Sequence, residues 1–330
     1  MSKKGPFTIQ ELKALPTGSQ LWGKYLVLEK NQRKTKDGRD IINLRLGDST
    51  GEVDAVVWDN CQVNGEVEAG VLLGVLGDLG SYNNKLQVTA KRIKALQEDI
   101  SSYLKKPDID IDSLIQQFNL VMDKVKEPAL RQLLEHIFTP EVRQQFYGAT
   151  AAKKVHHNYP GGLLEHTMQV AHLCLQTAAA YPMLNPDLLI TGALLHDIGK
   201  LDEYRTRVVT EYTVEGKLLG HIMMGVERIG AAIALIRSQN QDFPQELEWM
   251  VKHMILSHHG TTEFGSPVVP MFPEAFVLHM MDNLDAKMFV YTHKIKDTED
   301  GDEYFSNYDN FFQQYFFKYR FTGSEPNEAD

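Results

Sequence analysis

The sequence predicts a multidomain α+β protein in which a five-stranded β-barrel precedes an all-α domain. Short strand-like runs separated by tight turns fill most of the first 95 residues, a pattern typical of small barrels. Beyond residue 96, apolar residues recur almost entirely with helical spacing. All 12 histidines lie at or after His136, so any imidazole chemistry belongs to the second part of the chain.

The chain is 330 residues long, which favours more than one domain. We expect a barrel over residues 1–95, a helical connector over 96–150, the all-α domain over 151–322 and a disordered tail over 323–330. The connector lacks the Gly/Ser or Pro richness of a flexible linker. We therefore expect it to dock on the all-α domain.

The barrel strands are predicted at residues 20–30, 40–46, 52–58, 71–77 and 85–93. An Asp37-Gly38 turn between the first two is a strong hairpin signal. The long first strand, the hairpin and the Leu-x-Leu-x-Asp-x-Thr-Gly-x-Val run from Leu44 to Val53 together resemble an OB-fold.

An OB-fold commonly holds single strands by stacking bases on aromatic side chains over a basic groove. The resemblance therefore implies single-stranded RNA, or single-stranded DNA, as the partner. The main substrate-binding candidates are Trp22, Lys24 and Arg39. Further aromatic candidates for stacking are Tyr25, Trp58 and Tyr82. Further basic candidates for the groove are Arg33, Lys34, Lys36 and Lys85. The alternative is that the aromatic residues fill the barrel and the cations form a solvated face.

Charge is distributed unevenly between the two parts. The net charge is −10, which argues mildly against bulk nucleic-acid binding. However, residues 1–95 carry 14 Lys and Arg against 11 Asp and Glu, whereas the remainder carries 20 against 33. A slightly basic module is therefore joined to an acidic one that is suited to holding cations.

The composition also predicts where the protein works. No run approaches ~18 uninterrupted apolar residues, so we expect no membrane segment. The N-terminus lacks the apolar core of a signal peptide. The two cysteines, Cys61 and Cys174, are too far apart to suggest a disulfide framework. A reducing cytoplasm is the expected location.

Histidine and aspartate recur on successive predicted helices of the second part. These helices are expected at 163–180, 188–199, 217–237, 245–257 and 274–289. The residues are His166, His196, Asp197, His221, His258, His259 and Asp282. A single histidine in such an apolar pattern is more often a hydrogen-bonded core residue. Seven metal-ligand side chains on consecutive helices favour a metal centre instead.

The order His166, His196-Asp197, Asp282 resembles the H…HD…D pattern of the HD-domain metal-dependent phosphohydrolases. The additional His221 and His258-His259 resemble the second-metal ligands of the binuclear branch. The lead-in from Gly161 to Thr167, combined with the N-terminal barrel, is more specifically similar to the YhaM-type 3′-5′ exoribonucleases of bacteria. One departure is Gly162, which stands where some binuclear relatives carry a Glu ligand.

The resemblance implies two divalent ions. His166, His196 and Asp282 would hold one ion, His221, His258 and His259 the other, and Asp197 would bridge them as a catalytic residue. A mixed His/carboxylate shell suits Mn²⁺ best, with Fe²⁺, Co²⁺ or Mg²⁺ as alternatives. Such a pair can activate a water and clamp phosphate oxygens.

Three more side chains have candidate roles near the scissile phosphate. Lys200 is placed to neutralise phosphate charge as a second catalytic residue, or else it is only a helix-end charge. His156 and His157 precede the Gly161-Gly162 loop and either contact the terminal nucleotide or lie on the surface.

The leading hypothesis is a 3′-5′ exoribonuclease that releases nucleoside 5′-monophosphates. An HD-type nucleotidase or cyclic-dinucleotide phosphodiesterase is the alternative, but the chain has Gly260-Thr261-Thr262 where the cyclic-dinucleotide branch usually continues with Gly-Tyr-Pro. A non-enzymatic binding or scaffold protein is disfavoured because every core motif residue is present. The aromatic tail after Glu299, together with Met223 and Met224, suggests a homo-oligomer.

Overall fold

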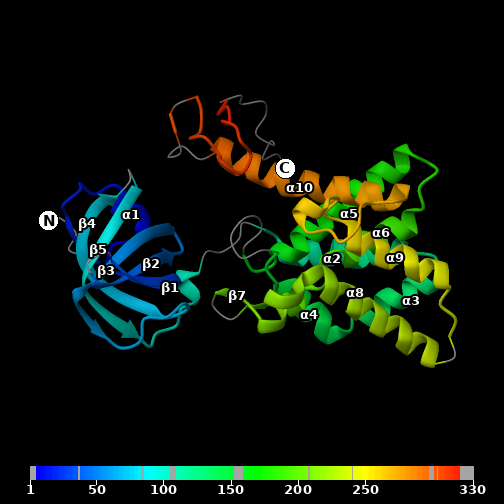
Figure 1. Cartoon of the computed structure of the whole chain (residues 1–330), viewed down its shortest axis with the longest axis horizontal. Coiled ribbons are helices and arrows are strands. Elements are labelled where there is room, and N and C mark those ends of the chain that lie inside the picture. Colours follow the sequence, from blue (N-terminus) through cyan, green and yellow to red (C-terminus); the bar gives the residue numbers. More distant parts are fainter. Residues whose placement is uncertain are drawn as a thin grey trace, which may run out of the picture. The chain divides into compact units, whose positions relative to one another are not determined.

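The computed structural model describes residues 5–35, 38–82, 85–104, 109–151, 159–206, 209–239, 241–296, 301–302 and 304–319. The chain divides into two units, residues 1–108 with 206–210 and residues 109–205 with 211–330 (Figure 1). The predicted tail at 323–330 lies outside the described residues.

The first unit is a closed five-stranded barrel with the strand order β1-β2-β3-β5-β4. Its strands are β1 (Gln20–Lys34), β2 (Asp40–Asp48), β3 (Gly51–Asn64), β4 (Leu72–Tyr82) and β5 (Lys85–Leu96). The predicted barrel is confirmed, and each strand is longer than expected. The additional residues at the ends of β1 and β3 are mostly exposed and polar, so apolar alternation does not mark them as strand.

Strand β1 closes the barrel because it pairs with two neighbours along its length. Its first half pairs antiparallel with β4, from Gln20 opposite Asp78 to Leu26 opposite Leu72. Its second half pairs with β2, out to Lys34 opposite Asp40. A register shift after Val27 marks the bend between the two halves.

A short helix, α1 (Ile9–Lys13), is tied to the turn between β2 and β3. Thr8 and Glu11 form a capping box at its N-terminus. The Asp48 carboxylate accepts hydrogen bonds from the backbone N–H groups of Ile9 and Thr50, both at 2.8 Å. Asp48 and Thr50 are the polar residues of the predicted Asp-x-Thr-Gly turn, so their role is to fix this turn.

The second unit is helical. Its longer helices are α2 (Ile111–Lys124), α3 (Pro128–Ile137), α4 (Pro140–Gly148), α5 (Gly162–Ala180), α6 (Pro186–Leu195), α8 (Val214–Ser238), α9 (Gln245–Ser257) and α10 (Pro273–Lys296). Its shorter elements are α7 (Lys200–Glu203) and η2 (Thr262–Phe264). The paired strands β6 (Tyr204–Thr206) and β7 (Thr210–Tyr212) each extend into residues 206–210, and η1 (Ser101–Tyr103) belongs to the first unit. Helices α3, α4 and α6 each begin with proline behind a side-chain cap, as the N-terminal preference of proline predicts.

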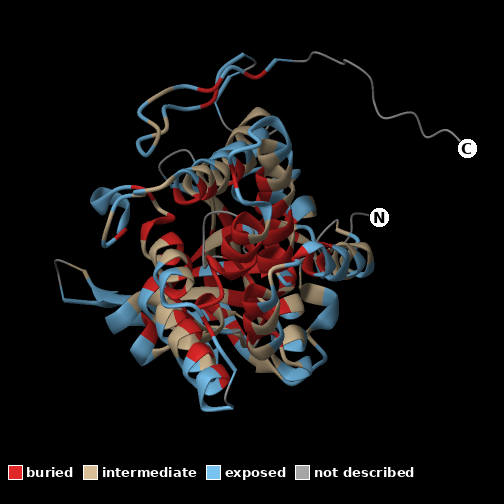
Figure 2. Ribbon diagram, turned by 90° about the vertical axis from the view of Figure 1, so that its right-hand side faces the viewer, coloured by how far each residue is buried: buried red, intermediate tan, exposed pale blue. Residues whose placement is uncertain are grey.

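Helix α6 lies at the centre of this unit. All residues from Leu188 to Leu195 are buried, and α6 contacts α2, α3, α5, α9 and α10. Figure 2 shows the buried residues gathered on the inner faces of the surrounding helices. Phe118, Leu130 and Phe146, from the predicted connector region, belong to the same core. Helices α2 to α4 are therefore packed as part of the helical unit.

Helix α8 is, among the described helices, the one with the length and apolar composition to cross a membrane. Only 28% of its most apolar stretch is buried. It nevertheless packs against α3, α7 and α9, and Gly220 (φ 73°, ψ 158°) interrupts its helical geometry. That no segment crosses a membrane stays a prediction.

The aromatic segment after α10 folds back on that helix. Isolated bridges join Phe305 to Phe317 and Asp309 to Gln314. The rings of Phe312 and Phe316 pack edge-on against Tyr291 of α10. The segment thus lies against its own helical unit, while self-association stays a prediction.

Gly199 allows α7 and α8 to approach each other through their backbones. A Cβ atom at this position would lie 2.0 Å from the carbonyl oxygen of His221 and 2.6 Å from the amide nitrogen of Gly225. Since both contacts are backbone, neither can move aside as a flexible side chain would.

We therefore expect Gly199→Ala to destabilise the helical unit by about 1–3 kcal/mol. Gly148→Ala is the matched control, because Gly148 ends α4 and no atom lies within 4 Å of its would-be Cβ. Thermal unfolding followed by helical circular dichroism should show a lower Tm for the first variant only. Equal Tm values for the two variants would contradict the close-packing argument.

Candidate metal centre

Two helix ends place imidazoles at the site in the same way. His196 follows the last residue of α6, and His258 follows the last residue of α9. Each Nδ1–H donates at 2.7 Å to the carbonyl three residues earlier, Ala193 for His196 and Ile255 for His258. A carbonyl only accepts hydrogen bonds, so Nδ1 carries the proton and Nε2 keeps a lone pair directed away from the helix.

His166 enters the site from α5 and is held by two carboxylates of α10. Its Nδ1 lies 2.6 Å from Asp285 Oδ2. Its Nε2 lies 3.2 Å from Asp282 Oδ1 and 3.1 Å from His196 Nε2. The Nε2 atom of His166 therefore lies close to both a second histidine and a carboxylate.

His221 and His259 complete the set from the other side. The break at Gly220 turns His221 so that both its backbone N–H and its Nδ1 face the Glu203 carboxylate, at 3.2 Å and 3.3 Å. His259 Nδ1–H donates to the Phe264 carbonyl at 2.8 Å. Both rings therefore also have Nδ1 engaged, which leaves Nε2 as the coordinating atom.

The Asp197 carboxylate lies between the two groups of histidines. Its Oδ2 is 3.5 Å from His166 Nε2 and 3.3 Å from His196 Nε2. Its Oδ1 is 3.5 Å from His221 Nε2 and 3.8 Å from His258 Nε2. One carboxylate therefore faces each histidine group with a different oxygen.

Charge and burial shift the pKa values of several groups in this centre. Burial opposes ionisation of Asp197, but Lys200 and His196 hold the pKa of its carboxyl well below the usual range. Burial lowers the pKa of His166, but its contacts with Asp282 and Asp285 outweigh burial and raise the pKa to about 10.

Two other histidines of the cluster, His258 and His259, have pKa values shifted in the opposite direction. Burial and the neighbouring His259 lower the pKa of His258 well below its ordinary value. Burial and His221 lower the pKa of His259. Neutral imidazoles are the form that a metal ion binds.

The donor set fits divalent metal ions. His166, His196 and Asp197 offer atoms that lie within 4.8 Å of one another, and so do His221, His258 and His259. Asp197 Oδ1, His221 Nε2 and His258 Nε2 are buried and have no hydrogen-bond partner among the residues that the structure describes. Buried polar atoms without partners are costly, and a bound cation would satisfy all three.

The structure brings together the seven residues that the sequence nominated as metal ligands, and Lys200 lies beside them. Lys200 begins α7 instead of ending a helix, because α6 stops at Leu195 and not at Gly199 as expected. Its buried ammonium donates to Asp197 Oδ2 at 2.6 Å. His156 and His157 lie outside the described residues.

The predicted strand-binding residues of the barrel differ in burial and in the groups that they contact. Tyr25 as a stacking residue is wrong, because its ring is fully buried and its hydroxyl donates to the Phe7 carbonyl. Trp22 is partly exposed, Lys24 donates to both oxygens of Glu98, and the Arg39 guanidinium lies 5.7 Å from the centre of the Trp58 ring.

Sequence reasoning missed two carboxylates that orient ligand histidines, Glu203 and Asp285. Asp285 lies three residues after Asp282, so a helical face shared with that candidate was an available signal. Glu203 had no such signal, because its contact with His221 depends on the turn between α7 and α8.

Two family models match the chain. Residues 27–96 match the model of an OB-fold nucleic acid binding domain. Residues 163–287 match the HD domain model, and this range contains every histidine and aspartate of the cluster. The chain joins an OB-fold to an HD domain. An HD domain indicates a metal-dependent phosphohydrolase, and the OB-fold beside it indicates a hydrolase that acts on nucleic acids.

Several solved structures are similar to a part of the chain. A replication protein A heterotrimer bound to single-stranded DNA is 19% identical over 28% of this chain and 80% of that chain, with a TM-score of 0.24. The second OB-fold domain of replication protein A from Methanococcus maripaludis is 21% identical over 29% of this chain and 98% of that chain, with a TM-score of 0.22. The p204 HINb domain is 23% identical over 28% of this chain and 47% of that chain, with a TM-score of 0.23.

The Asp285 contact predicts a measurable loss of metal affinity. Removing a carboxylate that orients a ligand histidine typically weakens metal binding about 10- to 100-fold. We expect Asp285→Ala to lower Mn²⁺ affinity of the HD domain in this range, with Asp285→Asn less affected because an acceptor is retained. Isothermal titration calorimetry with the metal-free protein measures the Mn²⁺ affinity of both variants.

The control is Asp112→Asn, an exposed carboxylate in the first turn of α2. It should bind Mn²⁺ as the unmodified protein does. Unchanged affinity in Asp285→Ala, with its helical circular dichroism intact, would show that Asp285 does not position His166.

Proposed function

We propose that this protein is a 3′-5′ exoribonuclease of the YhaM type, which hydrolyses single-stranded RNA, and single-stranded DNA as well, to nucleoside 5′-monophosphates. The proposal combines the HD domain with an OB-fold of the nucleic-acid-binding kind on one chain. The 3′-5′ direction rests on the similarity of the Gly161–Thr167 lead-in and the domain order to that group.

The position of Asp197 is the observation that carries the proposal. Its two oxygens face two separate histidine groups, which is the arrangement that a two-ion phosphodiesterase needs. When bound, divalent ions there supply an activated water and positive charge on the phosphate oxygens. We propose two ions, Mn²⁺ foremost, because the donor set mixes imidazole with carboxylate.

The protein side chains contribute orientation and charge. Asp285 and Glu203 hold His166 and His221 in fixed ring positions through their Nδ1 atoms. Lys200 keeps Asp197 ionised and adds a buried positive charge beside the cluster, where a phosphodiester would be bound. A buried cation next to a developing phosphate charge stabilises the transition state more strongly than one in water.

The barrel supplies the affinity for a long strand. The helical part is strongly acidic in sequence, so by itself it would repel a polyanion, whereas residues 1–95 carry a slight positive balance. Stacking on an OB-fold contributes ~1–3 kcal/mol per base and does not depend on sequence. We therefore assign strand holding to the barrel and cleavage to the HD domain.

Metal removal and product analysis test the reaction. Chelation should abolish hydrolysis of 5′-labelled single-stranded RNA, and Mn²⁺ should restore it better than Mg²⁺. The labelled strand should shorten stepwise from the 3′ end on a denaturing gel, and the 5′-monophosphates released from uniformly labelled RNA should be resolved by thin-layer chromatography. Cleavage of circular RNA, or turnover of cyclic dinucleotides or mononucleotides in place of RNA, would contradict the exoribonuclease assignment.

Asp197→Ala separates cleavage from binding. We expect the rate of RNA hydrolysis to fall at least ~10³-fold, because both histidine groups lose their shared carboxylate. RNA affinity, measured by fluorescence anisotropy, should remain within about twofold because the barrel is untouched. Loss of helical circular dichroism in this variant would instead assign Asp197 a structural role, and Asp112→Asn again serves as the matched control.

A further inference from the structure

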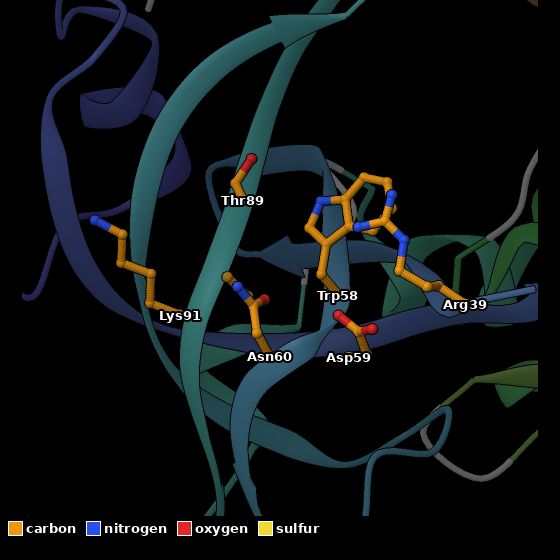
Figure 3. A pocket seen from close by; sticks show the side chains of 7 residues that line it. Arg39, Trp58, Asp59, Asn60, Thr89 and Lys91 are labelled. Atoms are coloured by element: carbon orange, nitrogen blue, oxygen red, sulfur yellow. The ribbon is translucent and has the colours of Figure 1, made fainter. Parts of the chain in front are cut away.

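The barrel surface contains a hollow of about 390 Å³ beside Trp58. Arg39, Trp58, Asp59, Asn60, Thr89, Ala90 and Lys91 line it (Figure 3). Its volume falls in the ~300–1,000 Å³ range of sites that take small molecules or parts of larger ones. Neither Trp22 nor Lys24, the other predicted strand-holding residues, lines this hollow.

The hollow exists because β5 changes register against both of its neighbours at one place. The parallel pairing of β3 with β5 shifts between Val57 and Gln62, so residues 58–61 have no partner on β5. The pairing of β4 with β5 shifts between Leu76 and Gly77, which leaves Lys91 outside the ladder. Bulges of this kind change the direction in which side chains point, and they are common beside binding sites.

Trp58 offers a flat face for stacking. The Arg39 guanidinium lies over this face, 5.7 Å from the ring centre (Figure 3). At a solvent-exposed position a cation–π contact contributes ~0.5–1 kcal/mol, whereas a stacked base contributes ~1–3 kcal/mol. A base can therefore replace the Arg39 guanidinium on the indole face, and the exposed Arg39 side chain can then contact the outer face of the base or its phosphate.

The polar groups of the hollow favour a base over a phosphate. The Lys91 ammonium is 2.5 Å from Asp78 and points away from Trp58. The Asp59 carboxylate, which only accepts hydrogen bonds, and the Asn60 carboxamide stand beside the indole. A carboxylate repels phosphate oxygens and accepts hydrogen bonds from the exocyclic amino groups of adenine, cytosine and guanine. The single N3–H donor of uracil lies between two carbonyl oxygens, which a carboxylate repels.

We propose that this hollow seats one nucleobase of the bound single strand, stacked on Trp58, and prefers a base with an exocyclic amino group (adenine, cytosine or guanine) over uracil through Asp59 and Asn60. The inference rests on the proposed function only in taking single-stranded nucleic acid as the ligand. It assigns the base-specific contact of the barrel to Trp58 rather than to Trp22.

Anisotropy of 5′-fluorescein-labelled A10, C10 and U10 with the full chain in EDTA tests this without hydrolysis. Trp58→Ala should weaken A10 binding about 5- to 150-fold, as the loss of one stacked base predicts. Trp58→Phe, which keeps a smaller stacking face, should lose less. Trp249→Ala is the matched control, because Trp249 is exposed on α9 and forms no part of either site. Helical and strand circular dichroism verify folding of each variant.

Base preference is tested separately from affinity. The unmodified protein should bind A10 and C10 at least about fivefold more tightly than U10, and Asp59→Asn and Asn60→Ala should each reduce this ratio. Because Asp59→Asn also removes a negative charge, the ratio between bases is the readout and not the absolute Kd. Equal Kd values for A10 and U10 in the unmodified protein would overturn the selectivity.

The inference and the proposed function fail in different ways. If the protein binds A10 through Trp58 but does not hydrolyse RNA with Mn²⁺, the proposed function is wrong and the hollow is still a base site. If it hydrolyses RNA but Trp58→Ala binds A10 as tightly as Trp249→Ala, the hollow is not the base site. A larger loss in Trp22→Ala than in Trp58→Ala would also overturn the assignment.

Discussion

The buried carboxylate of Asp197 is the constraint on which the helical unit depends. Leaving a carboxylate buried without compensation would cost several kcal/mol, so its surroundings must supply positive charge or donors. Lys200 supplies one charge at 2.6 Å, and histidine rings surround both oxygens. The same neighbours that make burial of Asp197 tolerable create a set of lone pairs directed at one small volume.

Backbone geometry fixes the orientation of the imidazole rings around that volume. Two of the imidazoles cap the carbonyl ends of α6 and α9, so the orphan carbonyl groups of each helix fix a ring orientation as well. His221 is oriented through the Gly220 break, and His166 through a carboxylate one turn from Asp282. Helix ends and a helix break therefore set most ligand positions. His196, Asp197, His258 and His259 follow the ends of α6 and α9, and His221 follows the break in α8, whereas His166 and the α10 carboxylates lie within unbroken helices.

The architecture and the ligand residues could be predicted because each leaves a local signal. Strand alternation, turn residues and the His-Asp pattern all appear within short windows of sequence. Tyr25 was placed incorrectly because its inward direction depends on the strand phase set by Leu21 and Gly23, and an aromatic residue suits either face. Glu203 and the hollow beside Trp58 could not be predicted, since one depends on a turn between helices and the other on register shifts between strands distant in sequence.

The double pairing of β1 has a consequence for how the chain folds. Gln20 pairs with Asp78, so closing the barrel joins residues 58 positions apart, and β3 must also find β5 across a parallel pairing. Non-local pairings of this kind are slow because the loop entropy is lost before the contacts form. During synthesis, the free edges of β1 and β3 remain exposed until β4 and β5 have left the ribosome. The barrel is therefore the part of the chain most dependent on protection from aggregation while the protein is being made.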